Sequence, residues 1–388
     1  MSWNALSIPS TKRITLDGNG ANVTRSGSTS IVSITVNSGG LTRVTNFKFS
    51  TTGSGYAPNM MVKVSGCTYS TATPLASFRI DHNTFNSNDL GHIFVGCQGR
   101  GLVDHNTFTW AGNNEVIHLW GSSAGSDTGW TDDVAPGTDA AVYFEDNSFR
   151  NTITGGYYLG GKMLMVYGAR AVYRFNTIEC AVIDVHGNTP RSGRWWELYQ
   201  NRFQLTPTCN NVDKWYQIRG GSGYIFQDSI GSGNLGAGTI TFWQDNGKSP
   251  STQDHVGLGK NQVQHPAYIW QSQTPAINED DSACGNCINA NRDYYRDTAS
   301  FNGTTGMGVG PLASRPATCT VGVAYWATDQ GEWWASRSGP DGQLYTCTST
   351  NAWSLSYTPY IYPHPLQSGT GGTTTGTPPP SPTNLKVS

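Results

Sequence analysis

The sequence predicts an all-β solenoid, a fold in which one short unit of strand and turn is repeated and stacked on itself. A phrase of alternating apolar and polar residues that leads to Asn, a small or polar residue and then Phe or Ile occurs five times within residues 77–204, for example as RIDHNTF, LVDHNTF and YFEDNSF. Its asparagines are spaced by 23, 41, 29 and 25 residues: Asn83, Asn106, Asn147, Asn176 and Asn201. Alternation of apolar and polar residues is typical of a β-strand. A unit this short cannot bury its own apolar face, so we expect successive copies to stack on one another.

The composition agrees with a solenoid and argues against two classes of partner. The chain has 388 residues with 47 Gly and 13% charged residues, and few of the Ala-, Glu-, Lys- and Leu-rich runs that favour helices. Because a solenoid grows by adding coils, we expect one elongated domain over residues 1–300. The formal net charge of −2 argues against nucleic acid, which needs a basic surface, and no apolar run approaches the length of a membrane span.

Asparagine suits the turn at the end of each phrase. It tolerates left-handed backbone, and its amide can bond its own backbone and the next Asn in the stack, so we expect a ladder of amides. The 41-residue step is then one coil plus an insertion from Gly121 to Ala140, which is rich in Gly, Ser, Asp and Thr and is expected to loop out.

Several phrases resemble a known group of folds: ITLDGNG, the DHNTF repeats, NEVIH, IDVHG, RWWELYQNRF and YTPYIYPHPL. Through them nearly the whole chain resembles the right-handed parallel β-helix superfamily, which contains pectate-lyase-like polysaccharide lyases, some glycoside hydrolases and phage tailspikes. It more closely resembles secreted bacterial proteins described only as right-handed β-helix repeat proteins. The resemblance implies a single-stranded right-handed parallel β-helix and an extracellular location. Because the first residues lack a basic head and an apolar core, we expect that a signal and an N-terminal cap preceded them.

The repeated phrase places one column of side chains on the outside of the coils. If the apolar positions Phe78, Ile80, Val103, Phe144, Tyr173 and Leu198 point inward, the position two before each Asn points outward. That column reads Asp81, Asp104, Glu145, Arg174 and Tyr199. Stacked carboxylates about 4.8 Å apart repel, so the column binds a cation, shares protons with raised pKa values, or is relieved by Arg174 and its neighbours.

The candidate metal ligands are therefore Asp81, Asp104 and Glu145, with calcium as the cation, because calcium prefers oxygen ligands. The resemblance implies the same cation, since lyases of this fold that act on acidic polysaccharides use calcium to neutralise a uronate. The alternative is that Asp81 and Asp104 only cap turns while His82 and His105 pack beside them.

A second group gathers guanidinium, imidazole, carboxylate and indole groups within about two coils: Arg170, Arg174, Asp184, His186, Arg191, Arg194, Trp195, Trp196 and Glu197. β-Elimination on a uronate needs a cation to neutralise its carboxylate, a base for the C5 proton and an acid for the leaving oxygen. We assign the first task to Arg170, Arg174 and Arg194 and the second to His186, because histidine is the kind of side chain whose ordinary pKa lies near neutrality.

Other roles remain open for this group. Hydrolysis would need two carboxylates about 5–10 Å apart, for which Asp184, Glu197 and Glu145 are candidates. Trp195 offers a face on which a sugar can stack. The structural alternative is an ion-pair network of Arg with Asp and Glu that closes the edge of the coils.

Two further residues, expected as outward neighbours of the acidic column, extend the predicted site as substrate-binding groups. Glu115 and His118 have the spacing of a helical HExxH-like metal motif, but they lie in a strand-like run, which argues against a metal site of that kind. His118 is the better candidate because Ile117 and Leu119 flank it in alternation. Lys162 follows a Gly-rich turn and is a candidate base in the manner of alginate lyases that resemble this fold. The GxGxxG match at residues 231–236 lacks a strand–helix unit, which argues against a dinucleotide site.

The eight cysteines suggest a disulfide-bonded extracellular protein: Cys67, Cys97, Cys180, Cys209, Cys284, Cys287, Cys319 and Cys347. Cys180 and Cys209 are about one coil apart and could face each other, and the pair at 319 and 347 brackets an aromatic segment and should form a disulfide. For the CGNC sequence at 284–287 we favour a structural disulfide over a zinc half-site or a redox pair, since no second ligand pair or βαβ unit is nearby.

The C-terminal residues form two further regions. Residues 301–366 are predicted to be a Cys-bracketed aromatic hairpin module, similar to short hairpins of phage-tail and surface proteins, followed by a segment that returns along the solenoid. Its indoles could stack on sugars, but we favour a cap over the open end of the coils. Residues 367–388 read as a Gly/Thr/Pro linker and the first strand of a fibronectin-III-like domain, so a downstream domain is expected.

These patterns favour an extracellular polysaccharide lyase, a monomer that acts on an acidic, uronate-containing polymer by β-elimination, with a glycoside hydrolase as the enzymatic alternative. Such an enzyme predicts that the acidic column and the arginine cluster converge in one cleft. A non-catalytic glycan-binding or adhesion module predicts scattered polar groups and aligned aromatic rings. A tailspike-like stalk predicts trimer contacts along one face and no cleft.

Overall fold

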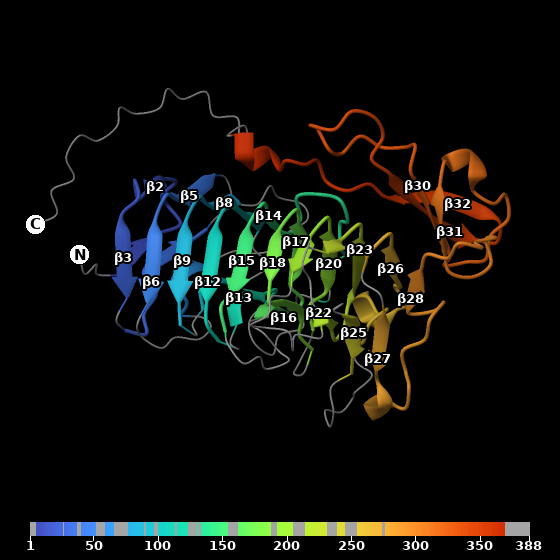
Figure 1. Ribbon diagram of the computed structural model, residues 1–388, viewed down its shortest axis with the longest axis horizontal. Helices are drawn as coiled ribbons and strands as arrows, with labels where there is room; N and C mark the ends of the chain where they lie inside the picture. Colours follow the sequence, from blue (N-terminus) through green and yellow to red (C-terminus); the bar gives the residue numbers. More distant parts are fainter. Residues whose placement is uncertain are drawn as a thin grey trace, which may run out of the picture.

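The computed structural model describes most of the chain, namely residues 5–25, 27–36, 40–51, 59–65, 77–88, 91–96, 100–112, 115–122, 130, 133–153, 162–187, 192–204, 214–230, 239–244, 254–273 and 276–368. It is a parallel β-helix, as the sequence predicts: each coil passes through three long sheets in the same order, and the strands within each sheet are parallel (Figure 1). No helix in this described part is long and apolar enough to cross a membrane.

The first sheet begins each coil. Its strands, in stacking order, are β1 (Leu6–Ile8), β4 (Val32–Thr35), β7 (Val62–Ser65), β10 (Ile93–Val95), β13 (Glu115–Trp120), β16 (Lys162–Val166), β19 (Val182–Val185), β22 (Lys214–Ile218), β25 (Thr239–Trp243) and β27 (Ile277–Asp280).

The second sheet follows it along the chain and carries the repeated phrase. Its strands are β2 (Thr15–Asp17), β5 (Leu41–Thr45), β8 (Ser77–Asp81), β11 (Arg100–Asp104), β14 (Val142–Glu145), β17 (Arg170–Arg174), β20 (Trp195–Tyr199), β23 (Ser222–Phe226), β26 (Ala267–Trp270) and β28 (Tyr294–Arg296).

The third sheet closes the coil. Its strands are β3 (Asn22–Arg25), β6 (Lys48–Thr51), β9 (Thr84–Ser87), β12 (Thr107–Trp110), β15 (Ser148–Asn151), β18 (Thr177–Glu179), β21 (Arg202–Gln204) and β24 (Ser229–Ile230). Short 3-10 helices lie outside the sheets: η1 (Lys260–Gln262), η2 (Ser282–Cys284), η3 (Leu312–Ser314) and η4 (Pro365–Ser368).

One continuous apolar core runs along the inside of the coils. The positions predicted to point inward, Phe78, Ile80, Val103, Phe144, Tyr173 and Leu198, are all buried in it, which confirms the inward half of the predicted alternation. On the third sheet the phenylalanines of successive phrases stack, with ring centroids 4.9 Å apart for Phe85 and Phe108 and 4.6 Å apart for Phe108 and Phe149. The same position in each repeat thus forms one layer of the core.

The asparagines form the predicted ladder between the second and third sheets. The backbone N–H groups of Asn83, Asn106 and Asn147 each donate to the side-chain oxygen of the Asn one coil further on, at 3.0 Å. The left-handed backbone, however, belongs to the residue before each Asn: His82, His105, Asp146, Phe175 and Gln200 have φ of 55°, 53°, 58°, 56° and 56°. The residue before each Asn therefore makes the turn, and the buried Asn forms hydrogen bonds with its neighbours. Of the two predicted reasons for Asn, hydrogen bonding is confirmed and tolerance of left-handed backbone is wrong.

We expect the replacement of Asn147 by Ala to destabilise the protein by about 2–4 kcal/mol, since buried groups on both neighbouring coils lose partners. The Asn147 amide donates to Val103 O at 2.8 Å and to Glu145 O at 3.1 Å, and its oxygen accepts the Asn106 amide at 3.1 Å. Urea unfolding measures the effect. The control is Asn86→Ala on the exposed side of β9, which should change stability little; equal losses in the two variants would contradict the role of the ladder.

The C-terminal module folds back onto the outer face of the second sheet. Strands β29 (Met307–Gly310), β30 (Ala324–Ala327), β31 (Gln343–Ser349) and β32 (Ala352–Tyr357) form a small sheet with antiparallel β30–β31 and β31–β32 pairs, as the hairpin prediction requires. Its buried Trp326 packs on Phe226 and Trp270, which are outward residues of β23 and β26. The module thus covers the side of the last coils, a position that the sequence did not predict.

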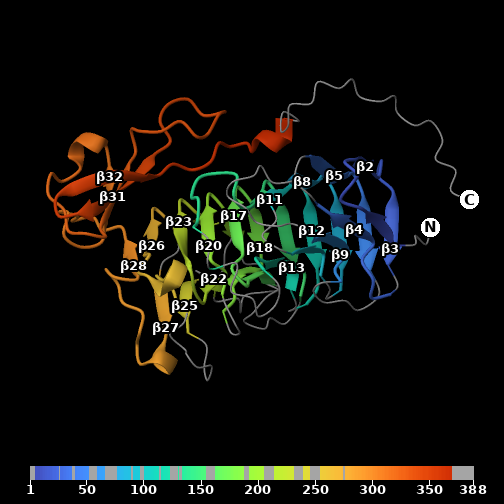
Figure 2. The ribbon, with the colours of Figure 1, turned by 180° about the vertical axis from the view of Figure 1, so that it is seen from behind.

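After β32 the chain runs back along the second sheet toward the N-terminal coils, as the red segment shows in both views (Figures 1 and 2). We call residues 357–368 the strap. Successive strap residues meet earlier and earlier coils: Tyr360 O accepts from Arg174, His364 N donates to Glu145, and Leu366 O accepts from Arg79. Gln367, predicted to begin a linker, instead belongs to η4 and donates to Glu145 Oε1 at 2.8 Å. The predicted linker beyond residue 368 lies outside the described residues.

Two of the predicted disulfides are confirmed. Cys284 bonds Cys287, and Cys319 bonds Cys347. Cys180 is also in a disulfide, but its predicted partner Cys209 lies outside the described residues, as do Cys67 and Cys97.

Candidate functional site

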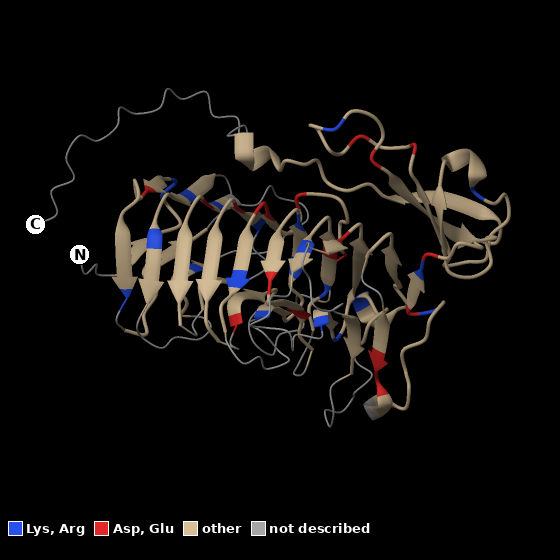
Figure 3. Ribbon diagram, in the orientation of Figure 1, with Lys and Arg blue, Asp and Glu red and all other residues tan. Residues whose placement is uncertain are grey.

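The predicted outward column on the second sheet is present. Strand register aligns Asp81 with Asp104, Asp104 with Glu145, Glu145 with Arg174, and Arg174 with Tyr199. Each carboxylate of the column has its own guanidinium partner, and charged groups of both signs lie side by side beneath the strap (Figure 3). Of the three ways to relieve the like charges, the structure uses ion pairs with arginine.

The arginines of the first two ion pairs, Arg43 and Arg79, belong to a neighbouring column of residues on the same sheet. Arg43 binds both oxygens of Asp81 at 2.7 and 2.5 Å, and Arg79 binds both oxygens of Asp104 at 2.9 and 2.8 Å. Burial alone would raise the pKa of Asp81, but hydrogen bonds from Arg43 and His82 outweigh it and lower that pKa below its ordinary value. Such pairs are bidentate and leave few free lone pairs on the carboxylates.

The histidines of the DHN turns pack as the structural alternative expected. His82 Nδ1 lies 2.8 Å from Asp81 Oδ2 and His105 Nδ1 lies 2.9 Å from Asp104 Oδ2. The two imidazole rings stack at 5.0 Å, nearly parallel. The DHN phrase therefore builds a repeated turn in which the acid, the imidazole and the amide all have partners in the fold.

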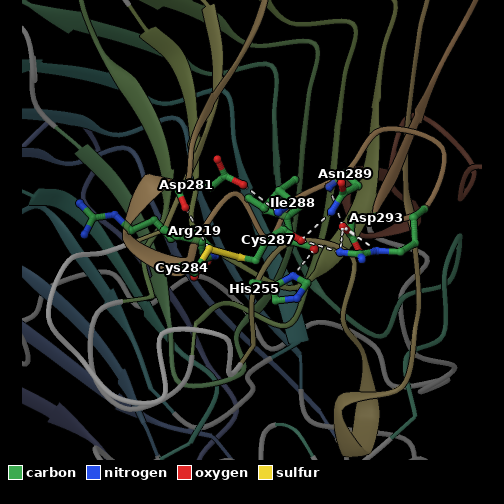
Figure 4. Close-up of a disulfide and its surroundings, with 11 residues drawn as sticks. Arg219, His255, Asp281, Cys284, Cys287, Ile288, Asn289 and Asp293 are labelled. Carbon is green, nitrogen blue, oxygen red and sulfur yellow. Dashed lines mark hydrogen bonds and ion pairs between the residues drawn. A yellow bond between two sulfur atoms is a disulfide. The ribbon is translucent and has the colours of Figure 1, made fainter.

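As arranged here, the three predicted metal ligands do not fit a calcium site. Calcium takes six to eight oxygen ligands, whereas the oxygens of Asp81 and Asp104 are bound by arginines. Glu145 binds Arg174 through Oε2, and its Oε1 accepts from His364 N and Gln367 Nε2. The one group of three possible ligands within mutual reach in the described ranges is Asp281, Cys284 and Cys287, and there the two sulfurs bond each other (Figure 4). These residues therefore give no support to a metal-dependent mechanism.

The strap buries two of the predicted catalytic residues. Arg174 donates to Glu145 Oε2 at 2.5 Å and to the strap carbonyls of Tyr360 and Ile361 at 2.6 and 2.8 Å. The carboxylate of Glu197 accepts hydrogen bonds from Gly137 N at 3.0 Å, Trp195 Nε1 at 3.0 Å and Tyr357 OH at 2.7 Å. Burial raises the pKa of Glu145 and of Glu197. These groups form the closing ion-pair and hydrogen-bond network that was the structural alternative.

A third location holds the remaining arginines and the predicted stacking residue. Arg170 and Arg194 lie at the corner where the first sheet passes into the second, and both are almost fully buried. Trp195 is also buried, since its ring lies 5.3 Å from that of His265 and its N–H is bound to Glu197. It does not offer an open face to a sugar. Arg191 lies outside the described residues.

The outer face of the first sheet carries the other predicted residues. Asp184 on β19 is fully buried, and Lys162 Nζ and His186 Nδ1 lie 3.7 and 3.5 Å from its Oδ2. Gln217 Nε2 donates to the same oxygen at 3.2 Å, and Arg219 Nε lies 3.7 Å from Oδ1. We call these five residues the Asp184 cluster.

His118 and Glu115 extend the cluster along the same face. In the strand register His118 aligns with Leu164 of β16 and through it with Asp184 of β19, so the three share one outward column. Glu115 aligns with Lys162. The rings of Phe94 and Trp120 lie against His118 at 6.3 and 5.8 Å. The structure thus brings together the predicted Asp184, His186, His118 and Glu115, together with Lys162.

The electrostatics of the cluster favour an ionised Asp184 and a neutral His118. Burial alone would raise the pKa of Asp184, but His186, Arg219 and Lys162 outweigh it and bring the pKa to about 2. Burial, helped by His186, lowers the pKa of His118 to about 3. Within the part of the chain that the structure describes, His118 Nδ1, His186 Nδ1 and Asp184 Oδ1 are buried and have no hydrogen-bond partner. This face therefore carries groups that can still donate or accept a hydrogen bond.

Sequence reasoning missed Gln217 and Arg219. The signal was the alternation in KWYQIRG, which places residues 217 and 219 on the face opposite to the buried Tyr216 and Ile218. It was missed because the phrase lies 33 residues beyond Asp184, past the strands of the coil that carries Asn201, and only the β19–β22 register brings the two together.

Comparison with known proteins assigns no relative: no protein-family model, curated protein or solved structure matches this chain.

Proposed function

We propose that the protein is a polysaccharide lyase whose active site is the Asp184 cluster on the outer face of the first sheet, with an acidic, uronate-containing polymer as substrate. The observation that carries the proposal is the fully buried, ionised Asp184 with Lys162, His186 and Arg219 within 3.5–3.7 Å of its oxygens. A concentrated set of acid, base and cationic groups on a sheet face is typical of a catalytic site. The resemblance to the pectate-lyase-like superfamily supports the same class of chemistry.

In this proposal His186 is the base. Its Nδ1 faces Asp184 Oδ2 at 3.5 Å, a distance at the limit of a hydrogen bond, and such bonds shorten when substrate binds. A carboxylate at Nδ1 favours the tautomer that carries its proton there, so Nε2 keeps its lone pair for the substrate. Asp184 is a positioning residue, since it acts through His186. The side chains of His186 and Lys162 are 18% and 14% exposed, so substrate can reach both.

The reaction balances with groups of this face. Lys162 and Arg219 bind the uronate carboxylate, which stabilises the negative charge that develops beside C5. His186 Nε2 takes the C5 proton, the electron pair of that bond forms the C4–C5 double bond, and the bond from C4 to the glycosidic oxygen breaks. The leaving oxygen takes a proton from water or from the imidazolium. His118, neutral because of its low pKa, supplies a hydrogen bond to the sugar.

The aromatic module gives less support to a glycan-binding protein. That alternative predicted aligned, accessible rings, but Trp326 and Trp333 are buried in packing against the solenoid. Tyr325 is buried within the module, where its ring lies near Phe301 and its hydroxyl donates to Pro311 O. Trp353 and Tyr345 lie on either side of Arg315, at 5.3 and 4.6 Å from its guanidinium carbon. These rings stabilise the module, so we place the substrate on the first sheet.

The test is the ultraviolet absorbance of the unsaturated product during incubation with pectate, alginate and glucuronan. We expect one polymer to give a rising signal and His186→Ala to lower kcat by about 10²–10⁴-fold, the usual effect of losing a general base. The control is His82→Ala, which removes a histidine that also faces an aspartate, but on the second sheet; it should leave the rate unchanged. A flat trace on every polymer would overturn the lyase, and full activity in His186→Ala would overturn this site.

A further inference from the structure

Arg194 is a buried arginine for which the described residues offer no hydrogen-bond acceptor at Nε or Nη1. Arg194 directly precedes β20, and its backbone N–H donates to Ala169 O at 2.8 Å. The residue is 2% exposed, and its guanidinium carbon lies 5.4 Å from the centre of the Trp130 ring. Arg170, on the neighbouring strand β17, is almost as deeply buried and donates to Asp133 O at 2.9 Å.

Arg194 differs from the other buried arginines in lacking an acceptor. Its Nε and Nη1 are buried without hydrogen-bond partners, and among the residues that the structure describes no ion pair to it is found. Arg79 and Arg174 are equally buried, yet they have carboxylate and carbonyl acceptors. An unpaired buried charge is strongly destabilising, so a fold that keeps one gains something from it.

The nearest carboxylates are bonded elsewhere. Asp133 Oδ1 lies 3.2 Å from Lys260 Nζ, and Asp254 Oδ1 accepts from Gln262 Nε2 at 2.6 Å. Both acids are close enough to favour the charged form of Arg194, but burial and the neighbouring Arg170 prevail and lower its pKa to about 10. The corner therefore keeps an excess of positive charge that an added anion would balance.

Gly259 and His265 lie beside Arg194 and add no charge that competes with its guanidinium for an anion. A Cβ added to Gly259 would lie 3.2 Å from Arg194 Nη2 and 3.2 Å from His265 Nδ1, so a side chain at this position would crowd both groups. Burial and Arg194 lower the pKa of His265 to about 4, so the imidazole is neutral at neutral pH and can donate a hydrogen bond.

We propose that Arg194, with Arg170 and His265, forms an oxyanion-binding site that takes a carboxylate or sulfate group carried by a saccharide. Guanidinium groups recognise both anions through charge-assisted hydrogen bonds. The Asp133–Lys260 ion pair borders the site, since Arg170 donates to Asp133 O, and its side chains are 82% and 39% exposed. Exposed pairs of this kind are weak, so we expect an anion to enter past this pair. The site lies apart from the Asp184 cluster, so the inference does not rest on β-elimination.

Calorimetric titration of the whole chain with D-glucuronate, sodium sulfate and glucose, at low ionic strength, tests the site. We expect saturable binding of glucuronate, sulfate or both, no binding of neutral glucose, and at least a tenfold weaker affinity in Arg194→Gln. The relative affinities of glucuronate and sulfate identify which anion the site prefers. The matched control is Arg150→Gln, which removes an exposed arginine on the third sheet and should not change binding. Equal affinities in Arg194→Gln and the wild type would overturn the proposal.

Thermal melting distinguishes this proposal from the alternative that the Arg194 side chain moves and binds an acceptor within the protein. If Arg194 awaits a ligand, the ligand-free Arg194→Gln protein should melt no lower than the wild type and should lose the rise in melting temperature that the anion gives the wild type. A clear fall in the melting temperature of the ligand-free variant would show an internal acceptor and overturn the site. Gly259→Ala, which crowds Nη2 while keeping the charge, should weaken anion binding by a similar factor.

Discussion

Replacing Arg174 by Met is expected to destabilise the protein by about 3–5 kcal/mol, because the change leaves Glu145 as a buried charge without its partner. Arg174 is fully buried and donates to Glu145 Oε2, to Tyr199 OH at 3.0 Å and to two carbonyls of the strap. The variant therefore loses the ion pair and part of the attachment of residues 357–368. Urea unfolding measures the first loss, and limited proteolysis near Tyr360 measures the second.

Two further variants separate charge from packing. In Arg43→Met the affected acid, Asp81, still contacts Thr45 and His82, and the arginine that is removed is partly exposed, so the expected cost is only about 1 kcal/mol. Adding Glu145→Leu to Arg174→Met should recover most of the loss, because the unpaired charge disappears. If Arg174→Met were as stable as Arg43→Met, the pair would not hold the strap.

The Arg174→Met deficit should grow with pH. Burial already raises the pKa of Glu145 in the wild type, and Arg174 is the largest influence that lowers it again. Without Arg174 the folded pKa rises further above the unfolded value of about 4.3. An acid with a raised folded pKa contributes stability that is complete below its unfolded pKa and is lost as pH rises through the folded pKa. The variant should therefore come nearest to the wild type at pH 4 and differ most at pH 8.

Replacing Asp228 by Asn is expected to stabilise the protein at neutral pH. Asp228 follows the left-handed Gln227 and takes the ladder position next to Asn201, whose backbone N–H donates to Asp228 Oδ1 at 2.8 Å. Burial raises the pKa of Asp228 to about 8, although hydrogen bonds from Tyr216 and Asn201 act against it. The folded protein thus keeps a proton that the unfolded chain releases above about pH 4.

The sign follows from proton linkage. Because the folded pKa is raised, the stability contributed by Asp228 is complete below about pH 4 and is lost progressively up to about pH 8. At pH 7 the loss is up to roughly 4 kcal/mol, and an amide at this position removes it. Urea unfolding at pH 5 and pH 8 should show the gain of Asp228→Asn increasing with pH. Asp17→Asn, at an exposed turn, should show no such trend; equal slopes for the two would contradict the buried acid.

The same residue shows how far the repeat could be predicted. The phrase YIFQDSI is a sixth copy, 27 residues after Asn201, in which Asp replaces the ladder Asn. This copy was not predicted because its ladder position carries a carboxylate instead of the amide shared by the other five. The β-helix itself, the inward residues and the Asn ladder were predicted correctly, because each depends on a short pattern that every coil repeats.

The candidate site was predictable only in part. His118 was predicted as an outward neighbour of the acidic column, but the strand register places it on the first sheet, in the column of Asp184. Asp184 and His186 were predicted to lie in one group, and they do lie together on one face, because alternation within a strand decides which side a residue faces. Arg170, Arg174, Arg194 and Glu197 were grouped with them because they are close in sequence. The coil separates them, since residues 184 and 186 belong to the first sheet, whereas residues 170, 174, 195 and 197 belong to the second. Closeness along a solenoid chain is therefore a poor guide to which face a residue shares.

By itself, the sequence determined the coil: its strands, its turns and the residues that point inward, because these follow from alternation and from hydrogen bonds between adjacent repeats. Only the tertiary structure decided what each outer face can do. The strap meets Arg79 with residues up to 288 positions further along the chain, and it turns an outward column of charges on the second sheet into a buried network. No local pattern encodes a contact of that separation. On the first sheet, the outward residues of the Asp184 cluster form the site of the proposed chemistry.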